Sequence, residues 1–202
     1  MPARTARTRS KNDPHRRQRI IDATARIIGE QGIGAVTFRS VAATAGVPLG
    51  STTYYFTDKD DLLVSTVRSL KAQSNQYFED VLEKYVPEFG VAGGIARMME
   101  HITTDWRASL FEGYGVYVST FSQQVLRAEV EDWTMVELVG RYCTPSAARP
   151  IAFYMEGILA QVVLGNAQVA VEEVENAVGR LLELGESVHA SEHALASAAV
   201  QQ

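Results

Sequence analysis

The amino-acid sequence predicts an all-α fold of about nine helices, and two observations support this prediction. Apolar residues recur at intervals of three and four along most of the 202 residues, which places them on one face of an α-helix. No segment has the strict apolar–polar alternation of a half-buried strand, and no internal repeat of about 20–50 residues is present. We therefore expect an N-terminal three-helix unit followed by a larger C-terminal helical unit.

Glycines, prolines and capping residues set the expected limits of the helices. Gly32 and Gly46 are suited to end the first two helices, and Asp58 is suited to cap a later one. The helices group into a first domain over 15–70 and a second over 71–189. The expected elements in order are a disordered basic arm over 1–14, helices over 15–31, 38–45, 48–55 and 58–85, a break over 87–94, helices over 95–110, 114–142 with a bend or break near 128–133, 146–165 and 171–188, and a flexible tail over 190–202.

The composition is that of an ordinary globular protein, with 46% hydrophobic and 21% charged residues. No stretch approaches the roughly 20 consecutive apolar residues of a membrane span, and the N-terminus lacks the apolar core of a secretory signal. Cys143 is the single cysteine, so the chain cannot form an internal disulfide. We therefore expect a cytoplasmic protein without a membrane partner.

The net charge of −5 conceals two parts of opposite charge. Residues 1–57 carry nine basic and three acidic residues, a net charge of +6, whereas residues 72–202 carry a net charge of −11. A polyanion responds to the field within a Debye length, about 8–10 Å, so the local charge matters more than the total. The basic part is therefore suited to a nucleic acid. A basic segment that only aids solubility is the alternative.

Residues 37–56 predict a helix-turn-helix, in which two short helices cross steeply and are joined by a tight turn. Thr37 is suited to cap the first helix, and Gly46 supplies the turn with a residue that tolerates positive φ. Short hydroxyls and aromatic rings suit phosphate oxygens, base edges and thymine methyls. The residues expected to face outward from the second helix are Leu49, Gly50, Thr52, Thr53, Tyr54 and Tyr55. The alternative is a hairpin whose aromatic residues pack internally, and we expect Phe56 in the core in either case.

Three runs within this segment carry a more specific signal, and they are Thr37-Phe38-Arg39-Ser40-Val41-Ala42, Gly46-Val47-Pro48-Leu49-Gly50-Ser51 and Tyr54-Tyr55-Phe56-Thr57-Asp58-Lys59. With these runs the chain resembles the TetR family of transcriptional regulators from about residue 16 to residue 63. The resemblance implies a dimer that binds double-stranded operator DNA. Beyond about residue 75 it implies only an all-helical domain for dimerisation and small-molecule sensing.

The resemblance also assigns roles to individual residues. Those that match DNA-contacting positions are Thr37 and Arg39 at the start of the first helix, Leu49, Gly50, Thr52 and Thr53 on the base-reading surface, and Tyr54, Tyr55 and Lys59 on the phosphates. Family members often have a tyrosine in place of Thr53 and a basic or polar residue in place of Leu49. We therefore expect an operator sequence different from those of better-known members. The basic arm either enters a minor groove or stays solvated.

The second domain offers candidates for a ligand cavity and for a dimer interface. Aromatic and methionine side chains suit a flat or flexible apolar ligand. The cavity candidates are Met98, Trp106, Tyr114, Tyr117, Phe121, Trp133, Phe153 and Tyr154, and the interface candidates are Ile151, Met155, Ile158, Leu159, Val162, Val174, Val178, Leu181 and Leu182. Burial in the core of the monomer is the alternative for both sets. A two-fold dimer would place two recognition helices about 34–36 Å apart on a near-palindrome.

The expected function is a ligand-responsive transcriptional repressor that is released from DNA by a small apolar or aromatic effector. A DNA-binding protein controlled by a partner, or by no ligand, is the first alternative. An enzyme is the second, but Cys143 has no sequence partner and His101 belongs to no metal-binding pattern. We expect no cofactor, no metal and no catalytic residues.

Overall fold

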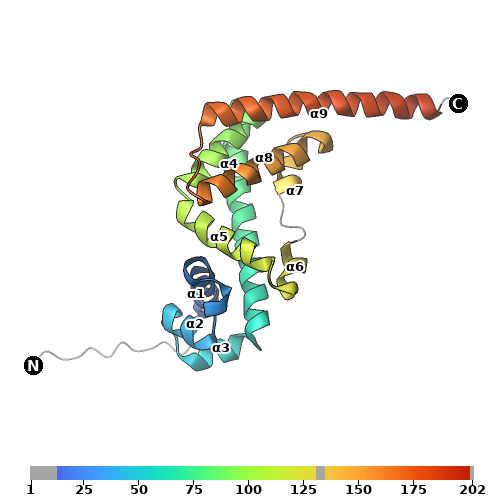
Figure 1. The fold of residues 1–202 in the computed structure, drawn as a ribbon. Helices are drawn as coiled ribbons and strands as arrows, with labels where there is room; N and C mark the ends of the chain where they lie inside the picture. The colour runs from blue at the N-terminus through green and yellow to red at the C-terminus, as the bar shows by residue number, and fades with distance from the viewer. Residues whose placement is uncertain (1–12, 131–134, 201–202) are drawn as a thin grey trace, which may run out of the picture.

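The computed structural model describes residues 13–130 and 135–200, with side chains as far as residue 190. Every regular element of this part of the chain is helical, as the sequence predicts (Figure 1). The α-helices are α1 (Arg16–Gln31), α2 (Phe38–Ala45), α3 (Leu49–Tyr55), α4 (Lys59–Thr103), α5 (Arg107–Thr120), α6 (Gln124–Val130), α7 (Met135–Gly140), α8 (Pro145–Val163) and α9 (Val171–Val200), with a 3₁₀ turn at Ile33–Ala35. Most of the predicted basic arm, residues 1–12, lies outside the described residues.

Figure 1 shows three levels along the long helix α4. Helices α1, α2 and α3 form a head around the beginning of α4, and α8 and α9 pack at its opposite end. Helix α5 crosses α4 between these two levels, so it is placed to contact both. None of the described helices combines the length and the hydropathy needed to cross a lipid bilayer.

Helix α4 differs from the prediction because it continues beyond Tyr85 and then folds back on itself. The backbone leaves helical geometry at Gly90, with φ 70° and ψ 178°, a conformation that glycine adopts readily. The break predicted over 87–94 is therefore a kink at one residue. After the kink, Gly94 lies so close to Val86 that a Cβ atom on Gly94 would be 2.6 Å from Val86 Cγ2. The two halves form a hairpin, and the second half ends at Thr103 instead of continuing to residue 110.

Two other predicted segments also differ. The stretch predicted over 114–142, with a bend or break near 128–133, is divided into α5, α6 and α7, and residues 131–134 lie outside the described part. The separation of α5 from α6 at residues 121–123 is the break that the sequence did not predict. Helix α9 continues to Val200, so the flexible tail predicted from residue 190 is helical over most of its length. The tail is rich in alanine, which has the highest helix propensity.

The head and the body share a hydrophobic core at their junction. Phe56, as predicted, is buried in the head, together with Ile20, Ile27 and Leu62. The same cluster includes Val116 from α5 and Leu126 from α6, each 1% exposed. Because these two residues belong to the second predicted domain, the boundary at residue 70 does not separate two independent cores.

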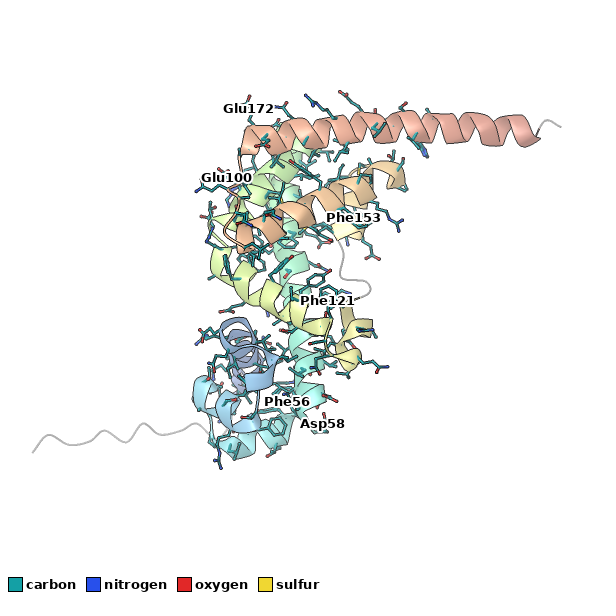
Figure 2. All side chains as sticks on the ribbon, viewed as in Figure 1. Phe56, Asp58, Glu100, Phe121, Phe153 and Glu172 are labelled. Carbon is teal, nitrogen blue, oxygen red and sulfur yellow. The ribbon has the colours of Figure 1, made fainter. Side chains whose placement is uncertain are left out.

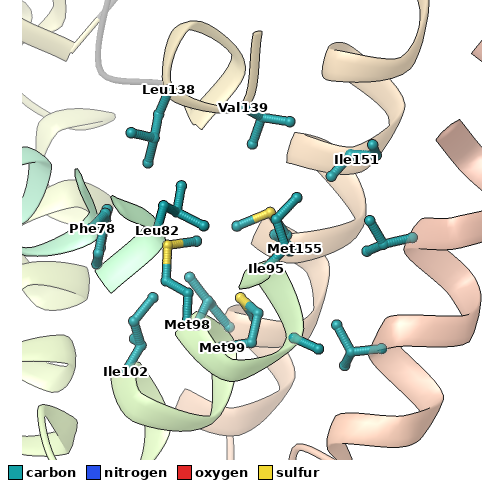
Figure 3. Close-up of a cluster of buried hydrophobic side chains, with 14 of the residues drawn as sticks. Phe78, Leu82, Ile95, Met98, Met99, Ile102, Leu138, Val139, Ile151 and Met155 are labelled. Atoms are coloured by element: carbon teal, nitrogen blue, oxygen red, sulfur yellow. The ribbon is translucent and has the colours of Figure 1, made fainter. Parts of the chain in front are cut away.

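A second core holds α4, α7, α8 and α9 together (Figure 3). Met98, predicted at the cavity, lies in this core and is not among the residues that line the cavity described below. Six residues predicted at the dimer interface are also buried in the monomer, and they are Ile151, Met155, Leu159, Val162, Val174 and Val178. Only Ile158, Leu181 and Leu182 of that set keep partial exposure. The prediction was wrong for the six because a wide apolar stripe includes the side that faces the monomer core.

Close packing of α8 on α9 leads to a test with a matched pair of glycines. A Cβ atom on Gly185 would lie 2.5 Å from Ala147 Cβ, whereas a Cβ atom on Gly179 has nothing within 4 Å. We expect Gly185→Ala to lower the free energy of unfolding by about 1–3 kcal/mol, because the two helices must move apart. Gly179→Ala is expected to raise it by about 0.5–1 kcal/mol through helix propensity. Urea unfolding measures both, and equal effects of the two substitutions would contradict this packing.

Candidate nucleic-acid interface and internal cavity

The turn between α2 and α3 has the local geometry of a helix-turn-helix. Thr37 caps α2, since its Oγ1 accepts a hydrogen bond from Ser40 N at 3.0 Å and Ser40 Oγ accepts one from Thr37 N at 3.0 Å. Gly46 ends α2 in the left-handed conformation, with φ 65° and ψ 35°. The amide of Val47 then donates to Ala42 O at 3.0 Å, which closes the turn before α3 begins.

One side of α3 is exposed and the other is fixed in the head. The exposed residues are Leu49, Gly50, Thr53 and Tyr54, which follow the spacing of one helix face. The side chain of Tyr54 is 80% exposed and meets the ring of Tyr55 edge-on, with 5.0 Å between ring centroids. Tyr55 itself is half-buried against the head core. An exposed aromatic residue with a hydroxyl is thus held on the outer surface of the head.

Thr52 corrects the predicted base-reading surface. It was expected to face outward, but it is fully buried and its Oγ1 donates to Leu49 O at 2.7 Å. Thr52 precedes Phe56 by four residues, so both lie on the side of α3 that faces the core. The outward residues that remain for base contact are Leu49, Gly50 and Thr53.

Two exposed cations lie at the beginnings of α2 and α4, the helices that precede and follow α3 in the chain. Arg39 is exposed on α2, and Lys59 is the first residue of α4, with its Nζ 3.3 Å from Ile33 O. Two of the neighbouring carboxylates accept hydrogen bonds from backbone amides. Asp58 Oδ1 accepts from Asp61 N at 2.8 Å, and Asp61 Oδ2 accepts from Thr57 N at 2.9 Å. These bonds cap α4 and leave Lys59 available to a phosphate.

A cavity of about 300 Å³ lies in the body between α4, α5, α7 and α8. Four of the predicted cavity residues line it, and they are Trp106, Tyr114, Tyr117 and Phe121. Figure 2 places Phe121 at the junction between α5 and α6. The sequence did not predict the remaining lining residues at the cavity, and they are Ser74, Asn75, Phe78, Ser109, Leu110, Gly113, Met135, Leu138, Glu156 and Leu159.

The other predicted cavity residues lie elsewhere. Phe153 is 58% exposed on the outer side of α8 (Figure 2). Tyr154 lines a separate surface hollow beside α9, together with Glu173 and Arg180. Trp133 lies outside the described residues. Adjacent positions on α8 thus face different environments, which apolar composition alone could not distinguish.

Aromatic contacts form two walls of the cavity. At one end, Trp106 stacks on Tyr77 with 4.8 Å between centroids and meets Phe78 edge-on at 5.7 Å. At the other end, Tyr117 meets Phe121 edge-on at 5.4 Å. Burial raises the pKa of the Tyr117 hydroxyl, and the nearby negative charge of Glu156 adds to this shift. These rings can bind a flat organic molecule by stacking and edge contacts.

The body and the head meet through the same helix that lines this cavity. A Cβ atom on Gly115 of α5 would lie 3.1 Å from Gly29 Cα of α1, so the two backbones are nearly in contact. Arg68 of α4 and Glu129 of α6 add a bidentate ion pair, with nitrogen–oxygen distances of 2.7 and 2.8 Å. The bond to Arg68 lowers the pKa of the Glu129 carboxyl.

Comparison with known proteins gives matches to regulators that bind DNA. The sequence pattern described as "Bacterial regulatory proteins, tetR family" matches residues 20–66. The HTH-type transcriptional regulator BetI of Rhizobium meliloti (strain 1021) is 47% identical over 58 residues, which are 29% of this chain and 29% of BetI. The match therefore spans under a third of the length of these curated relatives.

Two solved structures resemble the chain over most of its length. The multidrug binding protein EbrR complexed with ethidium is 34% identical, with a TM-score of 0.69 over 83% of this chain and 98% of EbrR. A TetR-family member from Streptomyces coelicolor A3 is 34% identical, with a TM-score of 0.71 over 84% of this chain and 99% of that protein. On this sequence identity, and on the helix-turn-helix described above, the chain belongs to the TetR family of bacterial transcriptional regulators.

Proposed function

We propose that this protein is a ligand-responsive transcriptional repressor, which binds a near-palindromic operator as a homodimer and is released by a small aromatic effector. The observation that carries this proposal is the double role of α5. Its side chains line the cavity, and Gly115 on the same helix lies against α1 of the head. A molecule that moves α5 therefore also moves the head.

The outer surface of the head supports operator binding. Thr53 and Leu49 face outward from α3 and can contact base edges, while Arg39, Tyr54 and Lys59 are exposed on the head and can bind phosphates. The recognition helix has only seven residues, from Leu49 to Tyr55. A single copy contacts few base pairs, so specificity favours two copies on a symmetric site.

The outer faces of α8 and α9 support the dimer. Exposed apolar side chains on these faces are Phe153, Leu164, Leu184 and Val188, which are 58%, 67%, 60% and 40% exposed. Gly157 lies one turn after Phe153 and has open space where a Cβ atom would be, which leaves room for a neighbouring helix. Helix α9 also extends well beyond the rest of the body (Figure 1). We assign the interface to these outer residues instead of those in the monomer core.

The cavity supports a small-molecule effector over the ligand-independent alternative. Its volume of about 300 Å³ is many times that of one water molecule, about 30 Å³. EbrR, which is 34–35% identical to this chain, has been solved with ethidium and with malachite green.

The enzyme alternative finds less support. Burial raises the pKa of the Cys143 thiol, and its Sγ donates to Val139 O at 3.4 Å, so the nucleophilic thiolate is disfavoured.

Release follows from differential binding to two arrangements of the dimer. An effector that fits the cavity only when α5 is displaced stabilises a head orientation in which the two recognition helices no longer match successive major grooves. Each 1.4 kcal/mol or so of preference for that arrangement lowers operator affinity tenfold. The hairpin of α4 holds the other side of the cavity while α5 moves.

The role of the head is tested by removing one cation. After an operator is selected from a random-sequence duplex library, Lys59→Ala is expected to weaken binding to operator and unrelated DNA alike. The slope of log affinity against log salt should fall by about one, because one phosphate contact is lost. Arg180→Ala removes the same charge from α9 and should leave both quantities unchanged. Unchanged binding by the Lys59 variant in fluorescence anisotropy would contradict the assigned surface.

The dimer interface is tested by placing charge on the outer faces of α8 and α9. The double variant Phe153→Glu, Leu184→Glu is expected to sediment as a monomer, since four carboxylates would be desolvated in a dimer. Val125→Glu places the same charge at a residue of α6 that is 41% exposed and should remain dimeric. A double variant that sediments as a dimer would refute this choice of interface.

The cavity is tested at Gly113, where a Cβ atom would meet nothing within 4 Å. Gly113→Leu is expected to fill part of the cavity and to weaken ethidium binding at least about tenfold, as followed by fluorescence without DNA. The variant should keep its operator affinity and lose its response to ethidium. Gly113→Ala, which occupies much less volume, is the control. Undiminished ethidium binding by the leucine variant would place the dye outside this cavity.

A further inference from the structure

The cavity contains a single carboxylate among otherwise aromatic, aliphatic and neutral polar lining residues. This carboxylate is Glu156, which α8 carries between Met155 in the core and Gly157 on the outer face. It is the only acidic residue in the 19 residues of α8. The side chains around it in the cavity include Tyr114, Tyr117 and Leu159. A lone acidic residue on an apolar helix is the sequence signal that could have identified it.

Within the described residues, Glu156 has no cationic partner. The ion pairs formed there involve Arg19, Arg68, Arg97, His101 and Arg141, and none of them includes Glu156. Burial raises the pKa of the Glu156 carboxyl, and a hydrogen bond from the backbone of Met135 offsets only part of this effect. A half-buried carboxylate that lacks a counter-ion is stabilised by any cation that reaches it.

The rings around Glu156 also favour positive charge. The faces of Trp and Tyr carry a negative quadrupole that attracts a cation within about 6 Å of the ring centroid. Trp106, Tyr114 and Tyr117 all line the same cavity as Glu156. An anion would be repelled by the carboxylate, and a neutral ligand would bury the carboxylate further without compensation.

We infer that the effector of this protein is a lipophilic aromatic cation, with Glu156 as its counter-ion and with the aromatic walls around its ring system. This inference rests on the proposed function of the cavity as the effector site and specifies the chemical class that the cavity selects. The carboxylate supplies most of the charge selectivity, while the aromatic walls bind both charged and neutral rings and add a smaller preference for the cation. Glu156 is therefore the specificity-determining residue, and it contacts the ligand directly.

The test compares two probes of nearly the same shape that differ in charge. They are 10-methylacridinium, a permanent cation, and acridine in mildly alkaline buffer, where it is neutral. Isothermal titration of the wild-type dimer without DNA is expected to give an affinity for the cation at least about tenfold higher than for acridine. This comparison needs no substitution, so it does not depend on the folding of a variant.

Two variants then assign the preference to a residue. Glu156→Gln keeps the volume and removes the charge, and it is expected to weaken cation binding about tenfold or more while changing acridine binding less than about twofold. Glu100→Gln removes an exposed carboxylate from α4 and should change neither affinity. Release from operator should follow the same order, with the cation losing its effect on the Glu156 variant.

The outcomes distinguish a wrong charge class for the ligand from a wrong location of the effector site. If both probes bind wild type equally and Glu156→Gln changes neither affinity, the cavity binds ligand but the inferred charge class is wrong. If the full preference for the cation survives in Glu156→Gln, the carboxylate is not its source and the inference also fails. If neither probe binds, or if Gly113→Leu leaves binding intact, the cavity is not the effector site and the proposed function fails first.

Discussion

The near-contact between the backbones of α1 and α5 is the constraint on which the rest of this structure depends. Gly29 and Gly115 allow it, because any larger side chain at Gly115 would separate the two helices. The contact places Val116 in the core of the head, so part of the sensor helix is also part of the DNA-binding unit. In interiors packed this closely, a small displacement of one helix is transmitted to its neighbour instead of being absorbed. The proposed regulation uses this property.

Helix α4 supplies the opposite wall of the cavity and the frame for both cores. It begins beside the recognition helix at the Asp58 cap and reaches the kink at Gly90, where it turns back on itself. The returning half contributes Met98 and Met99 to the second core, and that core fixes α8 in place. Glu156 therefore projects into the cavity from a rigid helix. A charged group held in this way can select ligands by charge, because little side-chain entropy is lost when it binds.

The sequence predictions were correct where residues close together in the chain determine the structure, and wrong where packing between helices determines it. The helix-turn-helix was predictable because the Thr37 cap, the Gly46 turn and the aromatic run each act within one or two turns of helix. The prediction for Thr52 was wrong because the sequence of a helix of only seven residues does not determine which side faces the core. For α8, apolar residues occur on more than one side, so composition did not distinguish the core residue Met155 from the exposed Phe153.

The sequence by itself determined that the chain is all-helical, where the recognition helix lies and that the N-terminal part is basic, because periodicity, capping and local charge are properties of neighbouring residues. Tertiary structure alone decided which aromatic side chains enclose a cavity and that Glu156 is among them, since those residues come from helices that are far apart in the chain. It also decided that α5 touches the head, because a contact between Gly29 and Gly115 leaves no periodic pattern in either helix. Interactions between neighbouring residues can be predicted from a short stretch of sequence, whereas packing between distant helices depends on the shapes of both helices.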